Sequence, residues 1–285
     1  MGAELTRPLV TTEWLAEHRK DPDVRIVDSS WYLPAMERNG RAEYAGGHIP
    51  GAAFWDIDHI ADPNSPLPHM LPSSSDFANH MASLGIGNDT KVVVYDGMGL
   101  FTAARPWWML RAFGHEDVAI LDGGLPKWIA EGRPVTDRPV PERVASFSPN
   151  PRPELVRRMD DILRNLDSGA EQILDARSAG RFSGAEPEPR PNCRPGHIPG
   201  SKNLPFDHLV DPQSKTVLPA NCLQGRFAKA GIDLERPVVT SCGSGVTACV
   251  LALGLHLLGK EDVAIYDGSW SDWGTSTETP IETLS

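Results

Sequence analysis

A glycine-rich turn around Cys242 is the part of the sequence best suited to covalent chemistry. Its letters are C-G-S-G-V-T, from Cys242 to Thr247, and it follows the apolar run P-V-V-T-S. Gly243 and Gly245 permit backbone angles that other residues avoid, so successive N–H groups can point inward as a nest for an anion. A helix that starts near Thr247 would add the positive end of its dipole. These features favour a thiolate that acts as a nucleophile.

Two other interpretations of this turn have to be weighed. A buried cysteine beside a tight turn would look the same, because free cysteine packs as a small hydrophobe. Cysteine-dependent phosphatases use C-x5-R, but Ala248 stands six residues after Cys242, and no arginine occurs between Gly243 and Leu258. The turn therefore disfavours phosphatase chemistry. The four cysteines form no C-x-x-C pair, so we predict no metal site.

The chain repeats itself, and the repeat provides a comparison for Cys242. The letters G-H-I-P-G occur around His48 and again around His197, and E-D-V-A-I also occurs twice in the same order. Collinear matches with nearly constant spacing indicate a duplication. The alignment places Asp96 of D-G-M-G opposite Cys242 of C-G-S-G. This position therefore does not require cysteine, which favours a chemical role, whereas both histidines are predicted to hold turns.

Each copy alternates short apolar runs with helical patterns. V-R-I-V-D, K-V-V-V-Y and D-V-A-I-L predict buried strands in the first copy, and Q-I-L-D-A, P-V-V-T-S and D-V-A-I-Y do so in the second. Strands that alternate with helices favour an α/β fold, with a mostly parallel sheet covered on both faces. Long helical patterns are expected to end at Gly114 and, for residues 246–258, at Gly259.

We expect two domains joined by a linker. The first domain is placed at residues 1–134, a proline-rich extended linker at 135–153, and the second domain at 154–285. Leu155, Met159, Ile162 and Leu166 recur at helical spacing, so a helix should open the second domain.

Composition argues against several classes of partner. The formal net charge of the 285 residues is −11, and an acidic chain repels phosphate backbones, so we expect no nucleic-acid partner. No segment approaches the roughly 20 apolar residues that span a bilayer. The start of the chain has no long apolar run behind basic residues, so we expect no signal peptide, no membrane partner and a cytoplasmic location.

The two G-H-I-P-G copies and the single cysteine turn make the chain similar to the tandem rhodanese-domain sulfurtransferases, over nearly its whole length. C-G-S-G-V-T-A, Y-D-G-S-W-S-D-W and S-W-Y-L-P resemble the branch of that family that uses 3-mercaptopyruvate. The thiosulfate branch has a basic turn of the form C-R-K-G-V-T, and here Gly243 and Ser244 replace the basic pair. The resemblance implies five-stranded sheets, a persulfide on Cys242, and neither metal nor organic cofactor.

The resemblance also implies how the sulfur donor is bound. Arg181 and Arg190 match G-R-F-x-G-x-E-P-E-P-R and would hold the carboxylate and carbonyl of a keto acid, where spacing alone would suggest surface salt bridges. Trp31 of S-W-Y-L-P would line the donor pocket, or else be a half-buried aromatic. The implied donor-binding set is Arg181, Arg190, Gly243, Gly245, Val246, Thr247 and Trp31.

Catalytic helpers are implied in the first copy. F-W-D-I-D and S-P-L-P-H-M-L-P match the family pattern and assign Asp58 and His69 to a proton relay with Ser244. Such a chain would orient the imidazole and assist proton transfer. Without the resemblance, His69 would be taken for an ordinary loop histidine.

We therefore predict a sulfurtransferase that moves sulfane sulfur from 3-mercaptopyruvate through Cys242 to a thiol, cyanide or a thioredoxin-like protein, with release of pyruvate. The nearest alternative is a thiosulfate:cyanide sulfurtransferase, against which the neutral turn argues. A non-catalytic tandem module that binds a partner is a further alternative. Such a module would have lost cysteine from both turns, and Cys242 argues against it.

Overall fold

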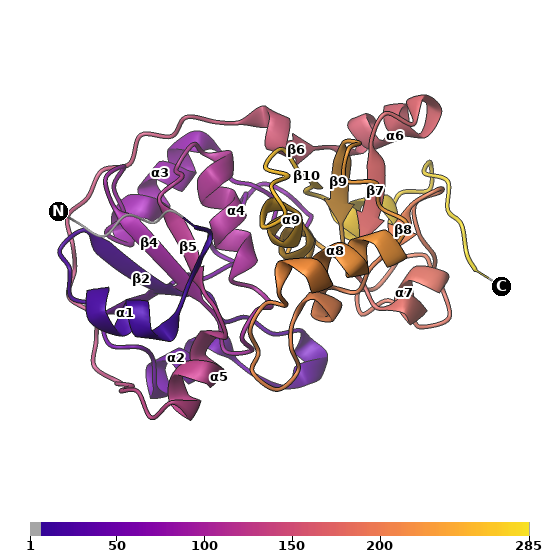
Figure 1. The fold of residues 1–285 in the computed structure, drawn as a ribbon. Coiled ribbons are helices and arrows are strands. Elements are labelled where there is room, and N and C mark those ends of the chain that lie inside the picture. Colours follow the sequence, from indigo (N-terminus) through magenta and orange to yellow (C-terminus); the bar gives the residue numbers. More distant parts are fainter. Residues whose placement is uncertain (1–6, 285) are drawn as a thin grey trace. The chain divides into compact units, whose positions relative to one another are not determined.

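The computed structural model describes residues 7–284, so the start of the chain, where we expect no signal peptide, lies partly outside the described residues. The chain divides into two compact units, which are drawn as a ribbon in Figure 1. Unit 1 comprises the residues up to Pro63, Leu71–Arg152 and Asp211–Val217. Unit 2 comprises Asn64–Met70, Pro153–Val210 and the residues from Leu218. Each unit thus includes one short segment from the other half of the sequence, which a division at a single linker does not capture.

Unit 1 is built on a five-stranded sheet in the order β1-β5-β4-β2-β3, and all of its strand pairs are parallel. Its strands are β1 (Leu9–Val10), β2 (Val24–Asp28), β3 (Ala52–Phe54), β4 (Lys91–Tyr95) and β5 (Val118–Leu121). Its helices are α1 (Thr12–His18), α2 (Gly40–Gly46), α3 (Ser74–Ser83), α4 (Ala104–Ala112) and α5 (Gly124–Ala130).

Helices cover both faces of this sheet because successive strand residues point to opposite sides. Ile26 of β2 and Val93 of β4 pack in one core with Leu15 of α1 and Trp128 of α5. Figure 1 shows α3 and α4 on the other side of the sheet from α1 and α5. Because both faces of the sheet are covered, its central strands are continuous apolar runs in the sequence.

Unit 2 repeats the same design. Its sheet has the order β6-β10-β9-β7-β8, again with every strand pair parallel. Its strands are β6 (Val156–Arg157), β7 (Gln172–Asp175), β8 (Lys202–Asn203), β9 (Val238–Ser241) and β10 (Ala264–Tyr266). Its helices are α6 (Met159–Ser168), α7 (Ala179–Ser183), α8 (Ala220–Lys229), α9 (Ala248–His256) and α10 (Ser269–Trp273). The two strand orders correspond one to one, which confirms the predicted fold and the duplication.

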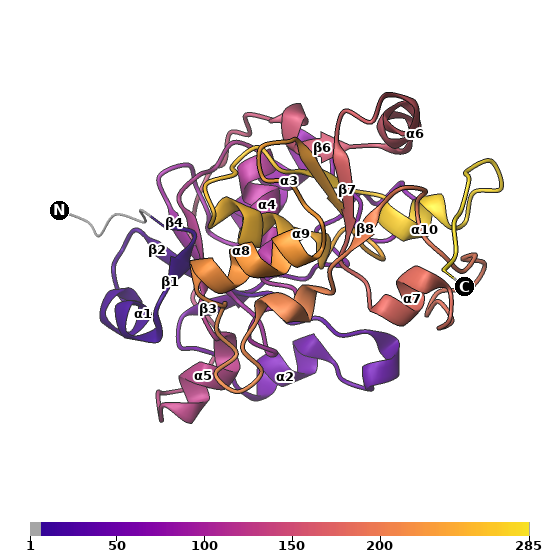
Figure 2. The ribbon, with the colours of Figure 1, turned by 45° about the vertical axis from the view of Figure 1, so that its right-hand side comes forward.

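In unit 2 the helices also separate onto two faces. Ile162 of α6 and Trp270 and Trp273 of α10 share a core with Val239 of β9. Figure 2 shows α8 and α9 together, away from α6 and α10. The helix α9 is shorter than predicted and ends at His256, three residues before Gly259, whose φ is +88°.

Two details near the predicted linker differ from expectation. Leu155 lies in a short 3-10 turn (Pro153–Leu155), and the helix α6 begins only at Met159. The proline-rich stretch before it is extended but belongs to unit 1. Phe147 packs edge-on against Phe77 with ring centroids 5.6 Å apart, and Asn150 N donates to Phe113 O at 2.8 Å.

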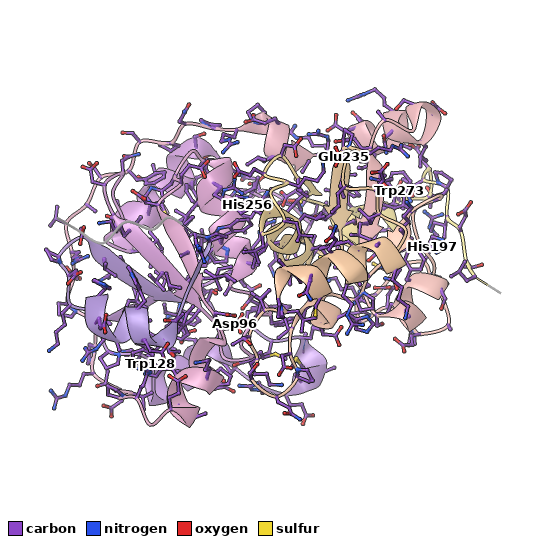
Figure 3. All side chains as sticks on the ribbon, in the orientation of Figure 1. Asp96, Trp128, His197, Glu235, His256 and Trp273 are labelled. Carbon is purple, nitrogen blue, oxygen red and sulfur yellow. The ribbon has the colours of Figure 1, made fainter. Side chains whose placement is uncertain are left out.

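In each unit a tryptophan of the last helix donates a hydrogen bond to the segment that follows that helix. Trp128 Nε1 donates to Pro134 O, and Trp273 Nε1 donates to Pro280 O, both at 2.8 Å. Both side chains are labelled in Figure 3. None of the described helices is long and apolar enough to cross a membrane.

Candidate active site

The turn around Cys242 follows a central strand of the second sheet. β9 lies between β10 and β7, and its carboxyl end at Ser241 leads directly into the turn. Ligands of open parallel sheets bind at such carboxyl ends. Gly245 has a φ of +73°, in the left-handed region that the glycine was predicted to allow. The Cys242 side chain is 1% exposed, so little water reaches the sulfur.

The backbone of this turn is anchored from α10. Cys242 N and Gly245 N both donate to the Ser269 hydroxyl at 3.1 Å. Gly243 O accepts from Ser271 N at 2.9 Å and from Ser271 Oγ at 2.6 Å. Four other N–H groups of the turn have no hydrogen-bond acceptor within the described part of the chain. They belong to Gly243, Ser244, Val246 and Thr247. They can therefore donate to negative charge on a bound sulfur.

Ser244 joins a histidine and an arginine beside the turn. Its hydroxyl lies 3.0 Å from His69 Nδ1 and accepts from Arg190 Nη2 at 3.0 Å. Because the hydroxyl has one proton and accepts from Arg190, it can donate that proton to His69 Nδ1, with the imidazole proton on Nε2. The structure thus brings together two of the predicted relay residues, His69 and Ser244, and both are buried.

The two predicted donor-binding arginines face the turn. A Cβ atom added to Gly243 would lie 3.1 Å from Arg181 Nη2 and 3.4 Å from Arg190 Nη1. Burial lowers the pKa of the Arg190 guanidinium, the Cys242 thiolate acts in the opposite direction, and Arg181 lowers it again. Two guanidinium groups therefore lie beside a turn that has no cationic side chain of its own.

Glu188 orients Arg181 and was missed in the sequence analysis. Its carboxylate pairs with Arg181 Nη2 at 2.6 Å and with Arg177 Nη1 at 2.7 Å. Arg177 is fully buried and also pairs with Asp175 at 2.6 Å. Arg181 is therefore part of an ion-pair network that reaches the core, and not a solvated surface pair. The acid within E-P-E-P-R was the available signal.

Trp31 and Asp58 contact each other within unit 1. Trp31 Nε1 donates to Asp58 Oδ2 at 2.9 Å, and the Trp31 ring stacks on Phe101 with centroids 6.4 Å apart. Asp58 thus has a partner among the predicted site residues. Its pairing with His69 stays a prediction, as does the contact of Trp31 with a donor.

The turn of the first copy has no thiol and is filled by its own carboxylate. Asp96 Oδ1 accepts from Met98 N at 2.8 Å. Asp96 Oδ2 accepts from Phe101 N, Thr102 N and Ala103 N at 2.7, 2.8 and 2.9 Å. Asp96, labelled in Figure 3, is 1% exposed. A glycine-rich turn after the equivalent strand therefore binds an anion through its N–H groups in this fold.

Each unit includes one short segment from the other half of the sequence, and each of these segments lies beside a turn. In unit 1, Val217 N donates to Asp122 Oδ1 at 2.8 Å, and burial raises the pKa of that carboxyl. A Cβ atom on Gly99 would lie 2.6 Å from Lys215 Cβ, so the segment Asp211–Val217 covers the turn of Asp96. In unit 2, the segment Asn64–Met70 supplies His69 to the turn of Cys242.

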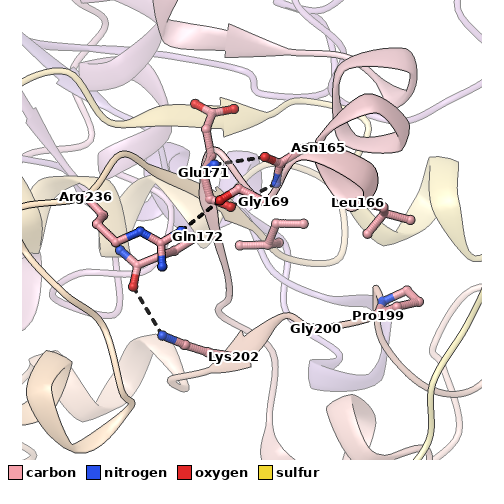
Figure 4. A pocket seen from close by; sticks show the side chains of 10 residues that line it. Asn165, Leu166, Gly169, Glu171, Gln172, Pro199, Gly200, Lys202 and Arg236 are labelled. Atoms are coloured by element: carbon pink, nitrogen blue, oxygen red, sulfur yellow. Dashed lines mark hydrogen bonds between the residues drawn. The ribbon is translucent and has the colours of Figure 1, made fainter.

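A surface pocket of unit 2 lies at the opposite edge of the sheet. Figure 4 shows Gln172, at the amino end of β7, among its lining residues. Lys202 Nζ donates to Gln172 Oε1 at 3.2 Å, and Arg236 Nη2 donates to Gly169 O at 2.8 Å. The cations of this pocket thus contact protein acceptors, and the pocket is separate from the carboxyl edge that bears Cys242.

The histidines of both G-H-I-P-G copies hold turns, as expected. His48 Nδ1 contacts Tyr44 O, and His197 Nδ1 contacts Phe182 O, both at 2.8 Å. Each histidine also stacks on the ring of the same neighbour. Their contacts explain why they occur in the copy without cysteine.

Comparisons with known proteins agree with this geometry. Residues 11–131 and 158–276 each match the Rhodanese-like domain family. The chain is 46% identical over 276 residues to the 3-mercaptopyruvate sulfurtransferase of Rattus norvegicus, with 95% of this chain and 93% of the relative covered. It is 45% identical over 300 residues to thiosulfate/3-mercaptopyruvate sulfurtransferase 1, mitochondrial, of Arabidopsis thaliana, covering 98% of this chain and 79% of the relative.

A solved structure shows the same fold. The crystal structure of SseA from Escherichia coli, described as showing the rhodanese fold and catalytic mechanism of 3-mercaptopyruvate sulfotransferases, superimposes with a TM-score of 0.85. The two sequences are 41% identical, and the match covers 93% of this chain and 99% of SseA. The chain therefore belongs to the rhodanese family, as a sulfurtransferase with two rhodanese-like domains.

Proposed function

We propose that the protein transfers the sulfur of 3-mercaptopyruvate through a persulfide on Cys242 to a thiol, cyanide or a thioredoxin-like protein, with release of pyruvate. One observation carries the proposal. The Ser244 hydroxyl, two residues after the buried Cys242, contacts both His69 Nδ1 and Arg190 Nη2 at 3.0 Å. A proton-transfer group and a carboxylate-binding group thus meet beside the thiol.

The first step forms the persulfide. The Cys242 thiolate attacks the sulfur of 3-mercaptopyruvate, a new S–S bond forms, and the C–S bond of the donor breaks. The electron pair of that bond passes to the donor carbon, which leaves as the enolate of pyruvate. The donor sulfur keeps its proton, and the N–H groups of the turn stabilise negative charge on it. The step needs no external oxidant, because the donor carbon is reduced as the enzyme sulfur is oxidised.

The enolate then takes a proton from the group formed by Ser244 and His69. General acid assistance of this kind contributes about 10²–10⁴-fold in many enzymes. Arg190 fits the same step, because its guanidinium reaches the Ser244 hydroxyl and can also bind the carboxylate of the leaving pyruvate. Asp58 is proposed to orient His69.

In the second half of the reaction an acceptor removes the outer sulfur. A thiolate attacks that sulfur, the S–S bond to Cys242 breaks, and the Cys242 thiolate is regenerated. The acceptor leaves as its own persulfide, or as thiocyanate when cyanide is used. Neither half requires a metal or an organic cofactor, since sulfur itself forms the covalent intermediate.

Thiosulfate is the second candidate donor. Arg181 and Arg190 place two cations beside Gly243, where a dianion would be attracted. The name of the Arabidopsis relative includes both donors. We favour 3-mercaptopyruvate, because the turn has Gly243 and Ser244 where the thiosulfate branch has a basic pair.

The test is sulfur transfer by the purified protein with each donor in turn. Pyruvate release is measured by coupled reduction, and the persulfide is detected by mass spectrometry of the peptide that contains Cys242. Cys242→Ser should abolish both signals, and Cys222→Ser, at an exposed free thiol, should retain both. A preference for thiosulfate would overturn the proposed donor but keep the persulfide. Activity in Cys242→Ser would overturn the assignment of the nucleophile.

We also propose that the protein works in the cytoplasm. The four cysteines are free thiols, which fits a reducing compartment. One relative is named as mitochondrial, so fractionation of the native cell, with immunodetection of the protein, is the direct test. Recovery with an organelle fraction would overturn the proposed location.

A further inference from the structure

We propose that Ser269 and Ser271 of α10 are positioning residues, which hold the Cys242 turn in the conformation that sulfur transfer requires. The proposal rests on the proposed persulfide chemistry, and it goes beyond the residues assigned above to the donor and to the proton relay. The turn and α10 are brought together because β10 pairs with β9, so that the ends of both strands lie at the same edge of the sheet.

Ser269 occupies a backbone position that favours glycine. Its φ is +50°, in the left-handed region, where a Cβ atom is crowded by the backbone. The first copy has Gly124 at the equivalent position, with a φ of +54°. The fold therefore asks for the same backbone angle twice, and only the copy with the thiol has a side chain there. An unfavourable backbone angle that is kept for a polar side chain points to a use for that side chain.

The hydroxyl of Ser269 is used to its full capacity. It accepts from Cys242 N and from Gly245 N at 3.1 Å, and it donates to Tyr266 O at 2.7 Å. A hydroxyl has one donor and two acceptor sites, so all three are occupied. Ser269 is 0% exposed, and its hydroxyl thereby ties two points of the turn to the end of β10.

Ser271 fixes a peptide group within the turn. Both its N–H and its hydroxyl donate to Gly243 O, at 2.9 and 2.6 Å. In a trans peptide the C=O and the following N–H point in opposite directions. Directing Gly243 O toward α10 therefore turns Ser244 N–H to the other side, where it can donate to sulfur. The equivalent residue of the first copy is Pro126, which has neither donor.

The comparison of the copies separates contacts that serve the fold from those added with the thiol. Trp270 N donates to Cys242 O, and Leu125 N donates to Asp96 O, both at 3.0 Å. That contact is common to both units and belongs to the fold. The contacts of Ser269 and Ser271 occur only beside Cys242, since the first copy has Gly124 and Pro126 there.

The decisive variant is Ser269→Gly. It removes the hydroxyl and gives the position the residue that the first copy already uses, so the fold should be retained. Removing the hydroxyl leaves Cys242 N, Gly245 N and Tyr266 O without this partner, so we expect the melting temperature to fall, partly offset by relief of the left-handed backbone angle. At a temperature where the variant is fully folded, the turnover number with 3-mercaptopyruvate should fall about ten-fold or more, as expected for a misplaced catalytic turn. KM for the donor should change little, because Arg181 and Arg190 are untouched. Ser168→Ala, at an exposed residue, is the matched control and should match the wild type.

Ser271 gives a second, independent measurement. Ser271→Ala should lower the turnover number, and Ser271→Thr, which keeps the hydroxyl, should restore most of it. Wild-type turnover in Ser269→Gly would overturn the proposal, and so would a loss of activity that only follows a loss of folded protein. Mass spectrometry separates this inference from the proposed function. If Cys242 of the wild type forms no persulfide, the proposed function itself is overturned. If the wild type and Ser269→Gly form the Cys242 persulfide equally fast, only this inference is overturned.

Discussion

Asp96 and Cys242 hold the same backbone position after β4 and β9, and each carbonyl oxygen accepts an N–H at 3.0 Å from the helix that follows the neighbouring strand, from Leu125 of α5 and from Trp270 of α10. At Asp96 a carboxylate accepts the N–H groups of its own turn. At Cys242 the side chain is a thiol, and N–H groups of the turn can donate to the sulfur that it takes up. One copy thus has a built-in carboxyl group where the other takes up a transferred sulfur.

Asp96→Ala should destabilise unit 1. The change leaves four N–H groups without their carboxylate acceptor, and three of them, those of Phe101, Thr102 and Ala103, are buried. Each buried unsatisfied group costs about 1–3 kcal/mol, so we expect the free energy of unfolding to fall by about 3 kcal/mol or more. Urea unfolding measures the change. Asp96→Asn retains one oxygen acceptor and should lose less, and an Ala variant as stable as the wild type would contradict the role of the carboxylate.

His69→Ala should slow the release of pyruvate. Without the imidazole beside Ser244 the enolate loses its assisted proton, and we expect the turnover number with 3-mercaptopyruvate to fall about 100-fold. His208→Ala, at an exposed histidine of the same unit, is the control and should be active. Steady-state pyruvate release measures both variants. Equal rates would remove His69 from the relay.

Arg190→Lys should weaken binding of the donor. Lysine keeps the positive charge but cannot form the paired hydrogen bonds of a guanidinium with a carboxylate. We expect KM for 3-mercaptopyruvate to rise about ten-fold or more, a loss of about 1.4 kcal/mol or more in binding. Arg164→Lys, at a largely exposed side chain, should leave KM unchanged. A changed turnover number with unchanged KM would assign Arg190 to the chemical step alone.

Asp28 should make stability depend on pH. Burial raises its pKa to about 6, above the value of about 3.9 in an unfolded chain. The folded state therefore holds this proton more tightly, and the stability it contributes is fully present below pH about 4 and is lost as the pH rises through about 6. The difference between the folded and unfolded pKa values corresponds to about 3 kcal/mol in the free energy of unfolding. Asp28→Asn removes this titration. The free energy of unfolding of the variant, minus that of the wild type, should therefore be higher at pH 7 than at pH 4.

The equivalent carboxylate in the second copy provides the control for that measurement. Asp175 pairs with the buried Arg177, and Asp175→Asn leaves that cation with one partner fewer. Removing one member of a buried ion pair costs about 3–5 kcal/mol, so this variant should lose stability at pH 7. Denaturant titrations at the two pH values measure both variants. A parallel response of Asp28→Asn and Asp175→Asn would contradict the difference in their environments.

The strands in the middle of each sheet could be predicted from the sequence, and the edge strands could not. β4 and β9 are buried on both faces, so they appear as continuous apolar runs. β1, β6 and β8 have two residues each, too few to show any period. These edge strands exist because a neighbour pairs with them, which is a tertiary effect.

The chemistry of the site was partly visible in the sequence as well. Cys242 and its glycines stand in one short segment, whereas Ser269 and Ser271 reach the turn only through the pairing of β10 with β9. No local pattern places a serine more than twenty residues away against a cysteine. A comparison of Y-D-G-S-W-S-D-W with L-D-G-G-L-P-K-W would have singled out both serines.

Because Asn64–Met70 belongs to unit 2 and Asp211–Val217 belongs to unit 1, the two copies depend on each other. A gene split between Arg152 and Pro153 would yield one product with His69 and no nucleophile, and another with Cys242 and no His69. Neither product would contain all the segments of a unit. Loss of the copy without a thiol would therefore also remove His69 from the copy that has one.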